Sequence, residues 1–325
     1  MKIHSSAAVI AWSVAALLGS PAAQSQTYPA KPVRVIVPFS PGGGTDIVAR
    51  IVAQKLTDRF GTPVLVDNRV GAAGAIGAEI VVRSAPDGYT LLVGSTSEIG
   101  IGPSLYSKLP YDVLRDLVAV TPLAATPMIL VVHPSMPVKT ARELAALALA
   151  RPGQINYGSA CAGSGAHMAT ELFRYLTKID IVHVPYKGVG PAITDVVGGQ
   201  VQILFTTVPS VTAFMKAGRL KALAVTSAER AQSIPEVPTM AESGVPGYEV
   251  EYWYGFFAPA ATPKDILARI HADTTEVLRL PDVIANFAKQ GVQPVIKTQE
   301  RFAAFVKADI EKWAVVVKAS GTKVD

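Results

Sequence analysis

Short β-rich runs alternate with amphipathic helical segments along most of this chain, and this alternation constrains the fold more than any other feature. Val33–Val37 is followed by a glycine-rich loop and then by a stretch in which apolar residues recur at helical spacing. The other β-rich runs are Val64–Val66, Thr90–Val93, Met128–Val132, Ile155–Tyr157, Ile181–Val184, Val201–Phe205 and Lys221–Val225. Repeated strand–loop–helix units predict an α/β fold with a mainly parallel sheet.

The helices are predicted from their caps and their spacing. Thr140–Glu143 matches a capping box that opens a helix. Thr262 and Pro263 suit the N-cap and the first turn of a helix that runs to about Arg279. The last helix is predicted over residues 299–319, and its apolar stripe indicates packing against the core: Phe302, Phe305, Val306, Ile310, Trp313 and Val317.

The strand–helix pattern restarts near Ile155, and an extended aromatic run, Tyr252–Ala258, precedes the last helices. Two such halves and a C-terminal return predict two lobes with a ligand cleft between them. We expect residues 26–126 and 247–325 to form the first lobe and residues 127–246 to form the second. In open α/β sheets ligands bind at the carboxyl ends of strands, so the loops after the strands are the informative ones.

The first 25 residues are predicted to lie outside the fold. They contain a short basic start, the apolar run Ala7–Leu18 broken only by a serine, and then small residues. This order is typical of a secretory signal peptide, and the run is shorter than the roughly 20 residues that span a bilayer. We expect cleavage after Ala22, Ala23 or Ser25 and a periplasmic product; a buried N-terminal helix is the alternative.

Composition excludes several classes of protein. Half of the 325 residues are hydrophobic and 17% are charged, whereas a disordered chain has low hydrophobicity and high net charge. The formal charge of +5 comes from scattered residues without a basic run, which disfavours nucleic-acid binding. Cys161 is the single cysteine, so no internal disulfide forms. The histidines after residue 25 lack the spacing of a zinc site: His133, His167, His183 and His271.

Nucleophilic catalysis is disfavoured as well, and no cofactor is predicted. Ser164 does not stand in a G-x-S-x-G sequence, because alanines occupy both glycine positions. Cys161 and His167 could form a nucleophile pair, but a small cysteine beside glycines is more often structural. An exported hydrolase therefore remains only as an alternative function.

The first glycine-rich loop, Ser40–Asp46, joins a predicted strand to a predicted helix. Its three glycines let the backbone turn tightly and approach a ligand, and a helix N-terminus favours an anion. The loop is neither a Walker loop nor a G-x-G-x-x-G sequence. We predict that it binds an anion, with an ordinary helix cap as the alternative. The candidate residues are Phe39, Ser40, Gly42, Gly43, Gly44, Thr45 and Asp46.

A second glycine-rich loop, Gly158–His167, occupies the equivalent place in the second half. Two such helix starts facing each other would bind an acid from both sides. The candidate residues are Ser159, Ala160, Gly163, Ser164, Gly165 and His167. A histidine inside a helix is more often structural than in contact with a ligand.

Three hydroxyl residues, Ser95–Ser97, follow another predicted strand directly. Ser95, Thr96 and Ser97 are predicted either to donate to a polar ligand or to form local turn hydrogen bonds. The glycines at positions 71, 74 and 77 are interpreted first as sites of close helix packing.

The chain also resembles the tripartite tricarboxylate transporter substrate-binding family, also called Bug or TctC-type receptors. The similar segments span the chain after residue 27: Tyr28–Arg34, Phe39–Asp46, Asp67–Arg69, Ala85–Thr90, Leu109–Asp112, His183–Gly188, Gly190–Pro191, Leu223–Thr226, Pro238–Glu242 and Trp253–Gly255. The resemblance implies a type II periplasmic-binding-protein fold with two lobes, two crossovers and a hinge. It also implies a receptor that hands small carboxylates to a membrane permease. In the family, the loops matching residues 42–46 and 159–165 hold one carboxylate, partly through bound waters.

This sequence departs from the family pattern beside the expected pocket. Thr206 and Thr207 stand where many members carry Asp-Asn, and Gly102-Pro103 replaces a common Asn-Pro. Without an acidic side chain there, a ligand ammonium group would lack a counter-charge. We therefore predict a non-amino carboxylic acid, favouring a dicarboxylate.

Three aromatic residues are predicted to line the ligand space, which leaves an aromatic diacid open: Phe39, Tyr186 and Phe205. Tyr186, Thr206 and Thr207 complete the candidate ligand-binding set. The partners predicted are a small carboxylate and the permease subunits of a tripartite transporter, and the protein is expected to be a monomer. A receptor that signals through a sensor protein is the other alternative.

Overall fold

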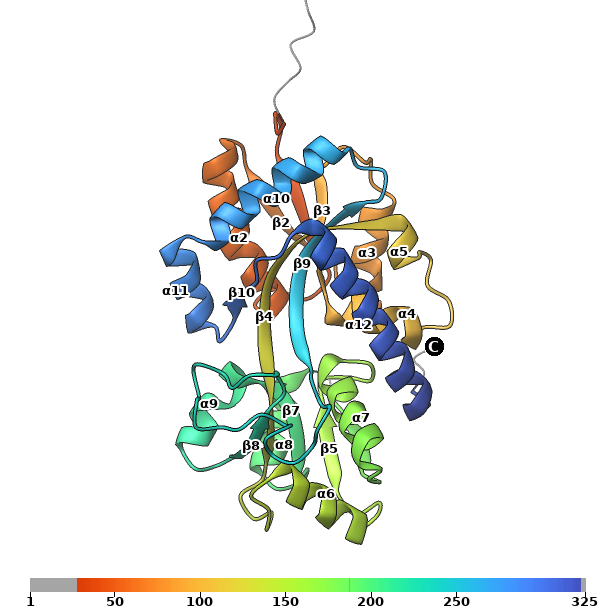
Figure 1. The fold of residues 1–325 in the computed structure, drawn as a ribbon, viewed down its shortest axis with the longest axis vertical. Helices are drawn as coiled ribbons and strands as arrows, with labels where there is room; N and C mark the ends of the chain where they lie inside the picture. The colour runs from red at the N-terminus through yellow and green to blue at the C-terminus, as the bar shows by residue number, and fades with distance from the viewer. Residues whose placement is uncertain (1–27, 187, 323–325) are drawn as a thin grey trace, which may run out of the picture. The chain divides into compact units, whose positions relative to one another are not determined.

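The computed structural model describes residues 28–186 and 188–322, and the chain from Lys31 onward forms one compact unit (Figure 1). The predicted signal peptide, residues 1–25, lies outside the described residues. Within the described ranges, no helix is long and apolar enough to cross a membrane.

The first lobe is built on the parallel strands β1 (Val33–Val37), β2 (Val64–Asn68) and β3 (Thr90–Ser95), with β1 between the other two. β1 is almost wholly buried, as the apolar run predicts. The antiparallel strand β9 (Glu251–Pro259) pairs with β3. The helices of this lobe are α2 (Gly44–Phe60), α3 (Ala75–Val82), α10 (Lys264–Leu278) and α11 (Pro281–Lys289).

The second lobe repeats the plan. Strand β5 (Asn156–Ser159) lies between the parallel strands β6 (Val182–Pro185) and β7 (Ile203–Thr207). Strand β8 (Lys221–Val225) pairs antiparallel with the long strand β4 (Leu117–Val132). The helices of this lobe are α6 (Ala141–Ala150), α7 (Gly165–Thr177), α8 (Val189–Val197) and α9 (Val208–Lys216). Both lobes combine strands with helices, so the predicted α/β class is confirmed. The sheet is mixed rather than mainly parallel, because β4 and β9 pair antiparallel with their neighbours.

Strand β4 (Leu117–Val132) belongs to both lobes. Its residues 117–127 pair with β9, and residues 128–132 pair with β7 and β8. The sequence predicted only residues 128–132, so the strand starts eleven residues earlier than expected. The sheet order is β2-β1-β3-β9-β4-β7-β5-β6, and the short strand β10 (Gln293–Pro294) also pairs with β4.

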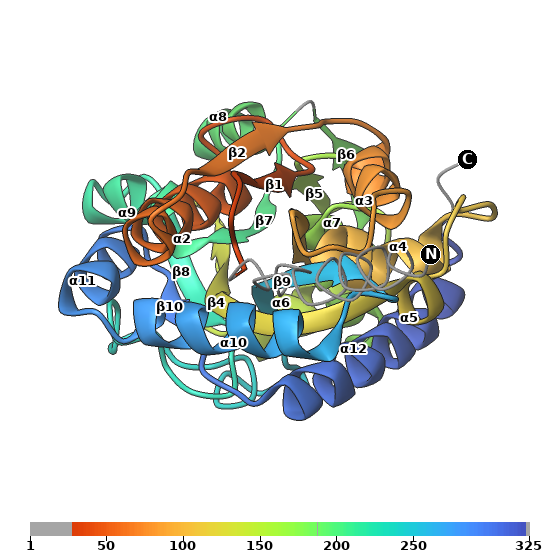
Figure 2. The same cartoon turned by 90° about the horizontal axis from the view of Figure 1, so that it is seen from above.

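The last helix, α12 (Gln299–Ser320), packs into both lobes. Phe302 and Val306 lie in a hydrophobic cluster of the first lobe, whereas Trp313 and Val317 lie in the main cluster of the second. Figure 1 shows α12 running from the level of β9 toward α7, which it contacts. Figure 2 shows α10 and α12 on the same side of β4 and β9.

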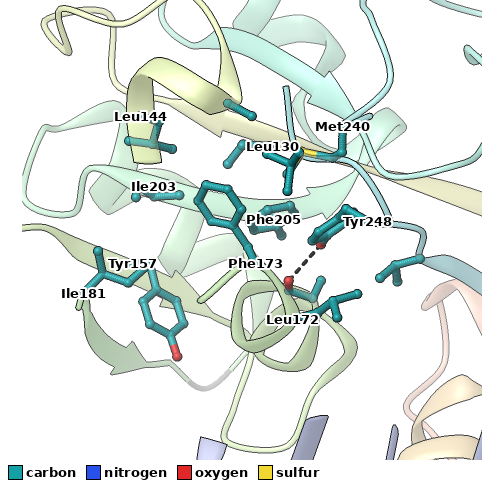
Figure 3. Close-up of a cluster of buried hydrophobic side chains, with 14 of the residues drawn as sticks. Leu130, Leu144, Tyr157, Leu172, Phe173, Ile181, Ile203, Phe205, Met240 and Tyr248 are labelled. Atoms are coloured by element: carbon teal, nitrogen blue, oxygen red, sulfur yellow. Dashed lines mark hydrogen bonds between the residues drawn. The ribbon is translucent and has the colours of Figure 1, made fainter. Parts of the chain in front are cut away.

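The core of the second lobe contains Phe205, which was predicted from the sequence to line the ligand space. Phe205 is 0% exposed and lies between Phe173 and Tyr248, with ring centroids 6.1 and 5.9 Å away (Figure 3). The Tyr248 hydroxyl donates to the carbonyl of Ala169 on α7 at 2.8 Å, so these three aromatic rings are hydrogen-bonded to that helix through Tyr248. The prediction that Phe205 lines the ligand space is therefore wrong.

The structure also differs from the sequence-based predictions at two helix caps and at several short elements. Helix α10 begins at Lys264, so its N-cap is Pro263 rather than the predicted Thr262, whose hydroxyl donates to the carbonyl of Pro259. The Glu143 carboxylate accepts from the backbone of Lys139, so the capping box at α6 is only half formed. Helix α11 was not predicted. The remaining short elements are η1 (Ala72–Gly74), η2 (Thr96–Ile101), α4 (Gly102–Leu105) and α5 (Val113–Asp116).

Candidate ligand-binding site

The first glycine loop ends in helix α2, whose N-cap is Gly43. Gly42 adopts a φ of +80°, which glycine tolerates, and its N–H donates to the Asp46 carboxylate at 2.9 Å. Asp46 also accepts hydrogen bonds from Arg50 and Asn68. Burial alone would raise the pKa of this carboxyl, but these hydrogen bonds hold the pKa below its usual value. The loop is thus fastened by an ionised side chain.

Helix geometry leaves the N–H groups of Gly44, Thr45 and Asp46 without intrahelical acceptors. Gly42, Gly43 and Gly44 are exposed, whereas the side chains of Thr45 and Asp46 are buried. The loop can therefore present backbone donors to a ligand without a side chain in the way.

The second glycine loop ends in helix α7, whose N-cap Ser164 accepts from the backbone N–H of His167. Gly163 adopts a φ of +77°, and its N–H donates to Nδ1 of His167 at 2.9 Å. Burial, with smaller contributions from His183 and Arg174, lowers the pKa of His167 to about 3. The imidazole is therefore neutral near pH 7, as an acceptor of this N–H must be.

The two loops share one arrangement, although they lie in different lobes. In each, a glycine with positive φ precedes the N-cap and donates its N–H to the side chain four residues later, which is the third residue of the helix. The acceptor is Asp46 in one loop and His167 in the other. Asp46 and His167 were both predicted as site residues, and each holds its loop in place.

Two tyrosines of β9 connect the helix starts, and the sequence analysis did not identify them as site residues. A Cβ atom at Gly44 would overlap the Tyr254 hydroxyl, and one at Gly165 would lie 2.7 Å from the Tyr252 ring. The two rings lie 5.4 Å apart. Tyrosines at alternate positions of one strand, which share a face, were the available sequence signal.

The Ser95–Ser97 hydroxyls are engaged by the protein. The Tyr252 hydroxyl lies 3.1 Å from Oγ of Ser95 and 2.8 Å from Oγ of Ser97. Thr96 accepts from the backbone of Trp253 at 3.0 Å. These partners lie on β9, so the hydrogen bonds are long-range and differ from the local turn bonds predicted as the alternative, and the ligand role of these hydroxyls stays a prediction.

Glu98 is a buried acid at this position. It is 2% exposed, and its carboxyl group contacts both the N–H and the hydroxyl of Ser95, at 2.5 and 2.6 Å. Burial raises the pKa of Glu98 to about 8, so the group is mainly protonated at pH 7. A neutral carboxyl does not repel an anionic ligand.

Gly74 packs against Glu98 and Phe39, which agrees with the packing role predicted for this glycine.

The remaining candidate ligand-binding residues differ in their hydrogen bonds and in their exposure to solvent. The Tyr186 hydroxyl donates to Asp195 at 2.6 Å, and Thr207 bonds Ser210 at 2.8 Å. Thr206 is 3% exposed on β7, whereas Ser40 is exposed and Ala160 is half-buried.

The nucleophile pair considered from the sequence is not assembled. Nδ1 of His167 is occupied by the Gly163 N–H, and burial raises the pKa of the Cys161 thiol. Within residues 28–186 and 188–322, no group of three or more His, Cys, Asp or Glu side chains could hold a metal ion.

The geometry agrees with comparisons to known proteins. The family described as "Tripartite tricarboxylate transporter family receptor" matches residues 48–322. Protein BugT of Bordetella pertussis is 41% identical over 301 residues, which is 92% of each chain. "R. palustris Rpa4515 with adipate" is 33% identical with a TM-score of 0.81, covering 91% of this chain and 99% of that chain. MatC from Rhodopseudomonas palustris, with bound malate, is 32% identical with a TM-score of 0.77, covering 89% and 100%.

Two α/β lobes joined by shared strands, each with a glycine-rich helix start, define a type II periplasmic-binding-protein fold. Because the family model matches residues 48–322 and BugT is 41% identical, this chain belongs to the tripartite tricarboxylate transporter receptor family. The predicted family and fold are confirmed. The family is one of solute-binding receptors and not of enzymes, so the hydrolase alternative is set aside.

Proposed function

We propose that this protein is a periplasmic receptor that binds a small carboxylate between its two glycine loops and delivers it to the permease of a tripartite transporter. The observation that carries the proposal is the paired arrangement at Gly42–Asp46 and Gly163–His167. Each loop offers backbone donors at a helix N-terminus, where partial positive charge favours an anion.

We further propose that the ligand is a dicarboxylate without an amino group. Thr206 and Thr207 are uncharged, and the carboxyl group of Glu98 is occupied by Ser95. The ionised Asp46 of the first loop is already paired with Arg50. A ligand ammonium group would therefore lose its hydration without gaining an unpaired anionic partner. Relatives with bound adipate and malate agree with this class of ligand.

The protein is proposed to act as an exported monomer whose lobes rotate about a hinge. The change of β4 partners between Pro127 and Met128 supports a lobe boundary near residues 126–127. N-terminal sequencing of the periplasmic protein is expected to begin between Ala23 and Gln26. Recovery of soluble periplasmic protein that starts at Met1 would contradict export with cleavage.

The ligand is tested by a thermal-shift screen of mono-, di- and tricarboxylates, followed by calorimetry with succinate and aspartate. A ligand at 100 times its Kd stabilises the folded state by about 2.7 kcal/mol, which is readily measured. Succinate differs from aspartate by the amino group alone, so tighter binding of succinate is the expected result. Tighter binding of aspartate would overturn the proposed ligand class.

A further inference from the structure

A cluster of polar side chains, three of them buried and two half-buried, contacts the second glycine loop. The rings of His167 and His183 are stacked, with centroids 3.9 Å apart and planes inclined by 5°. The Tyr157 ring stacks on His183 at 4.8 Å. Glu171 and Arg174, on α7, complete the cluster, and none of the five takes part in the proposed function as a ligand contact.

Both histidines hold the backbone of this loop. His167 accepts the N–H of Gly163 through Nδ1 at 2.9 Å. His183 places Nε2 2.6 Å from the hydroxyl of Ser159, and that hydroxyl donates to the carbonyl of Cys161 at 3.0 Å. Because the hydroxyl has one proton, Ser159 must accept from His183. The histidines thus fix positions 159, 161 and 163 of the loop.

The charges around the histidines are balanced within the cluster. Glu171 is 2% exposed, accepts from the Tyr157 hydroxyl at 2.5 Å and from Arg174 at 2.8 and 3.0 Å. Its carboxylate lies 3.7 Å from Nε2 of His167. Asp180 lies 4.0 Å from Arg174. Because Arg174 already neutralises Glu171, His167 can stay uncharged and keep Nδ1 free to accept, consistent with its lowered pKa.

We propose that His167 is a positioning residue for ligand binding: its unprotonated Nδ1 holds Gly163, and with His183 it keeps the second glycine loop in the conformation that accepts a carboxylate. The proposal rests on the proposed function and adds a role for a side chain that does not itself touch the ligand. Without the acceptor, the buried N–H of Gly163 has no partner at this position, and the loop must rearrange to satisfy it.

The test compares His167→Asn with His167→Leu. Asparagine carries Oδ1 on Cγ, as histidine carries Nδ1, so it can accept the same N–H, whereas leucine cannot. We expect His167→Asn to keep the affinity for the dicarboxylates succinate, malate and adipate within about threefold and His167→Leu to lose about tenfold or more, the range of one unsatisfied buried donor. His133→Asn is the matched control, because His133 also accepts a backbone N–H, from Ser135, outside the loop.

Amide hydrogen exchange of residues 159–163, without ligand, provides the second readout. We expect faster exchange in His167→Leu and wild-type exchange in His167→Asn. Equal affinity and equal exchange in both variants would overturn the proposal, as would equal losses in both. If the wild-type protein binds none of the three acids, the proposed ligand class fails, whereas the exchange difference still decides whether His167 positions the loop.

Discussion

At the start of α2 the N–H of Gly42 is held by a carboxylate, and at the start of α7 the N–H of Gly163 is held by an imidazole. The backbone is nearly the same in both places, with φ values of +80° and +77°. The surroundings differ, because Asp46 is paired with the half-exposed Arg50, whereas His167 lies among buried groups.

One loop conformation can thus be fixed by a charged or by a neutral acceptor, provided that the neighbouring groups match its charge state. An ionised acceptor beside an anion site requires a cation, which Arg50 supplies. A neutral acceptor requires only that it stay unprotonated, which burial of His167 ensures. The two loops should therefore respond differently to mutation and to pH.

Substitution of Asp46 in the first loop is expected to lower the stability of the protein more than any other change considered below. Asp46→Ala would leave Gly42, Asn68 and Arg50 without their shared acceptor, so we expect a loss of about 2–4 kcal/mol in the free energy of unfolding. Asp46→Asn keeps one oxygen acceptor and should lose less. Urea unfolding of both variants measures this, and equal stability of wild type and Asp46→Ala would show that the carboxylate does not hold the loop.

The next effect concerns ligand binding alone. Gly43 has a φ of −78°, and a Cβ there would meet only the carbonyl of Ser40 at 3.4 Å. Gly43→Val should therefore fold normally yet obstruct approach to the helix N-terminus, with a loss of about tenfold or more in affinity for succinate, malate or adipate. Calorimetry and melting curves separate the two effects. Unchanged affinity would show that the first glycine loop is only a turn and does not contact the ligand.

A smaller difference between the two loops is expected in how their contributions to stability depend on pH. The pKa of His167 is about 3 in the folded state against 6.5 for an ordinary histidine, so its contribution to stability is complete above pH 6.5 and is lost as pH falls toward 3. The pKa of Asp46 is lowered from 3.8, so its contribution is lost only at still lower pH. The melting temperature of His167→Asn should fall less than that of wild type between pH 6.5 and 4. Identical slopes would contradict a neutral His167.

The smallest effect is on closure. Rotation of the lobes around a bound dicarboxylate would bring the two loops together and reduce the radius of gyration measured by small-angle scattering. We expect a modest reduction, and a greater one in Val317→Ala, which weakens the contact of α12 with the second lobe. Scattering curves that do not change at saturating ligand, in either protein, would argue against rotation.

The sequence was sufficient for features that depend on local pattern. The loop from Ser40 to Asp46 was recognised because a β-rich run, three glycines and an amphipathic helix follow one another. The first half of β4 was missed because it contains Pro122 and Pro127, and proline is rare inside central strands. The structure accommodates this stretch with register shifts on both sides of Thr121–Pro122 against β9.

Features that depend on distant contacts could not be predicted. The contacts of Tyr252 with Gly165 and of Tyr254 with Gly44 join segments far apart in the chain, and nothing local in the sequence pairs them. The neutral state of His167 was also not predictable, because it depends on burial against His183, which comes from strand β6.

Helix α12 has a mechanical consequence for the hinge. Strand β4, which passes from one lobe to the other beside β9, would form the flexure if the lobes rotate. Because α12 is anchored in the cores of both lobes, it acts as a strut beside that flexure, and any rotation must slide or strain one of its ends. The travel of the joint is then limited at both extremes. If the lobes rotate, a receptor with such stops is expected to move through a short arc and to lose little conformational freedom when it closes on its ligand.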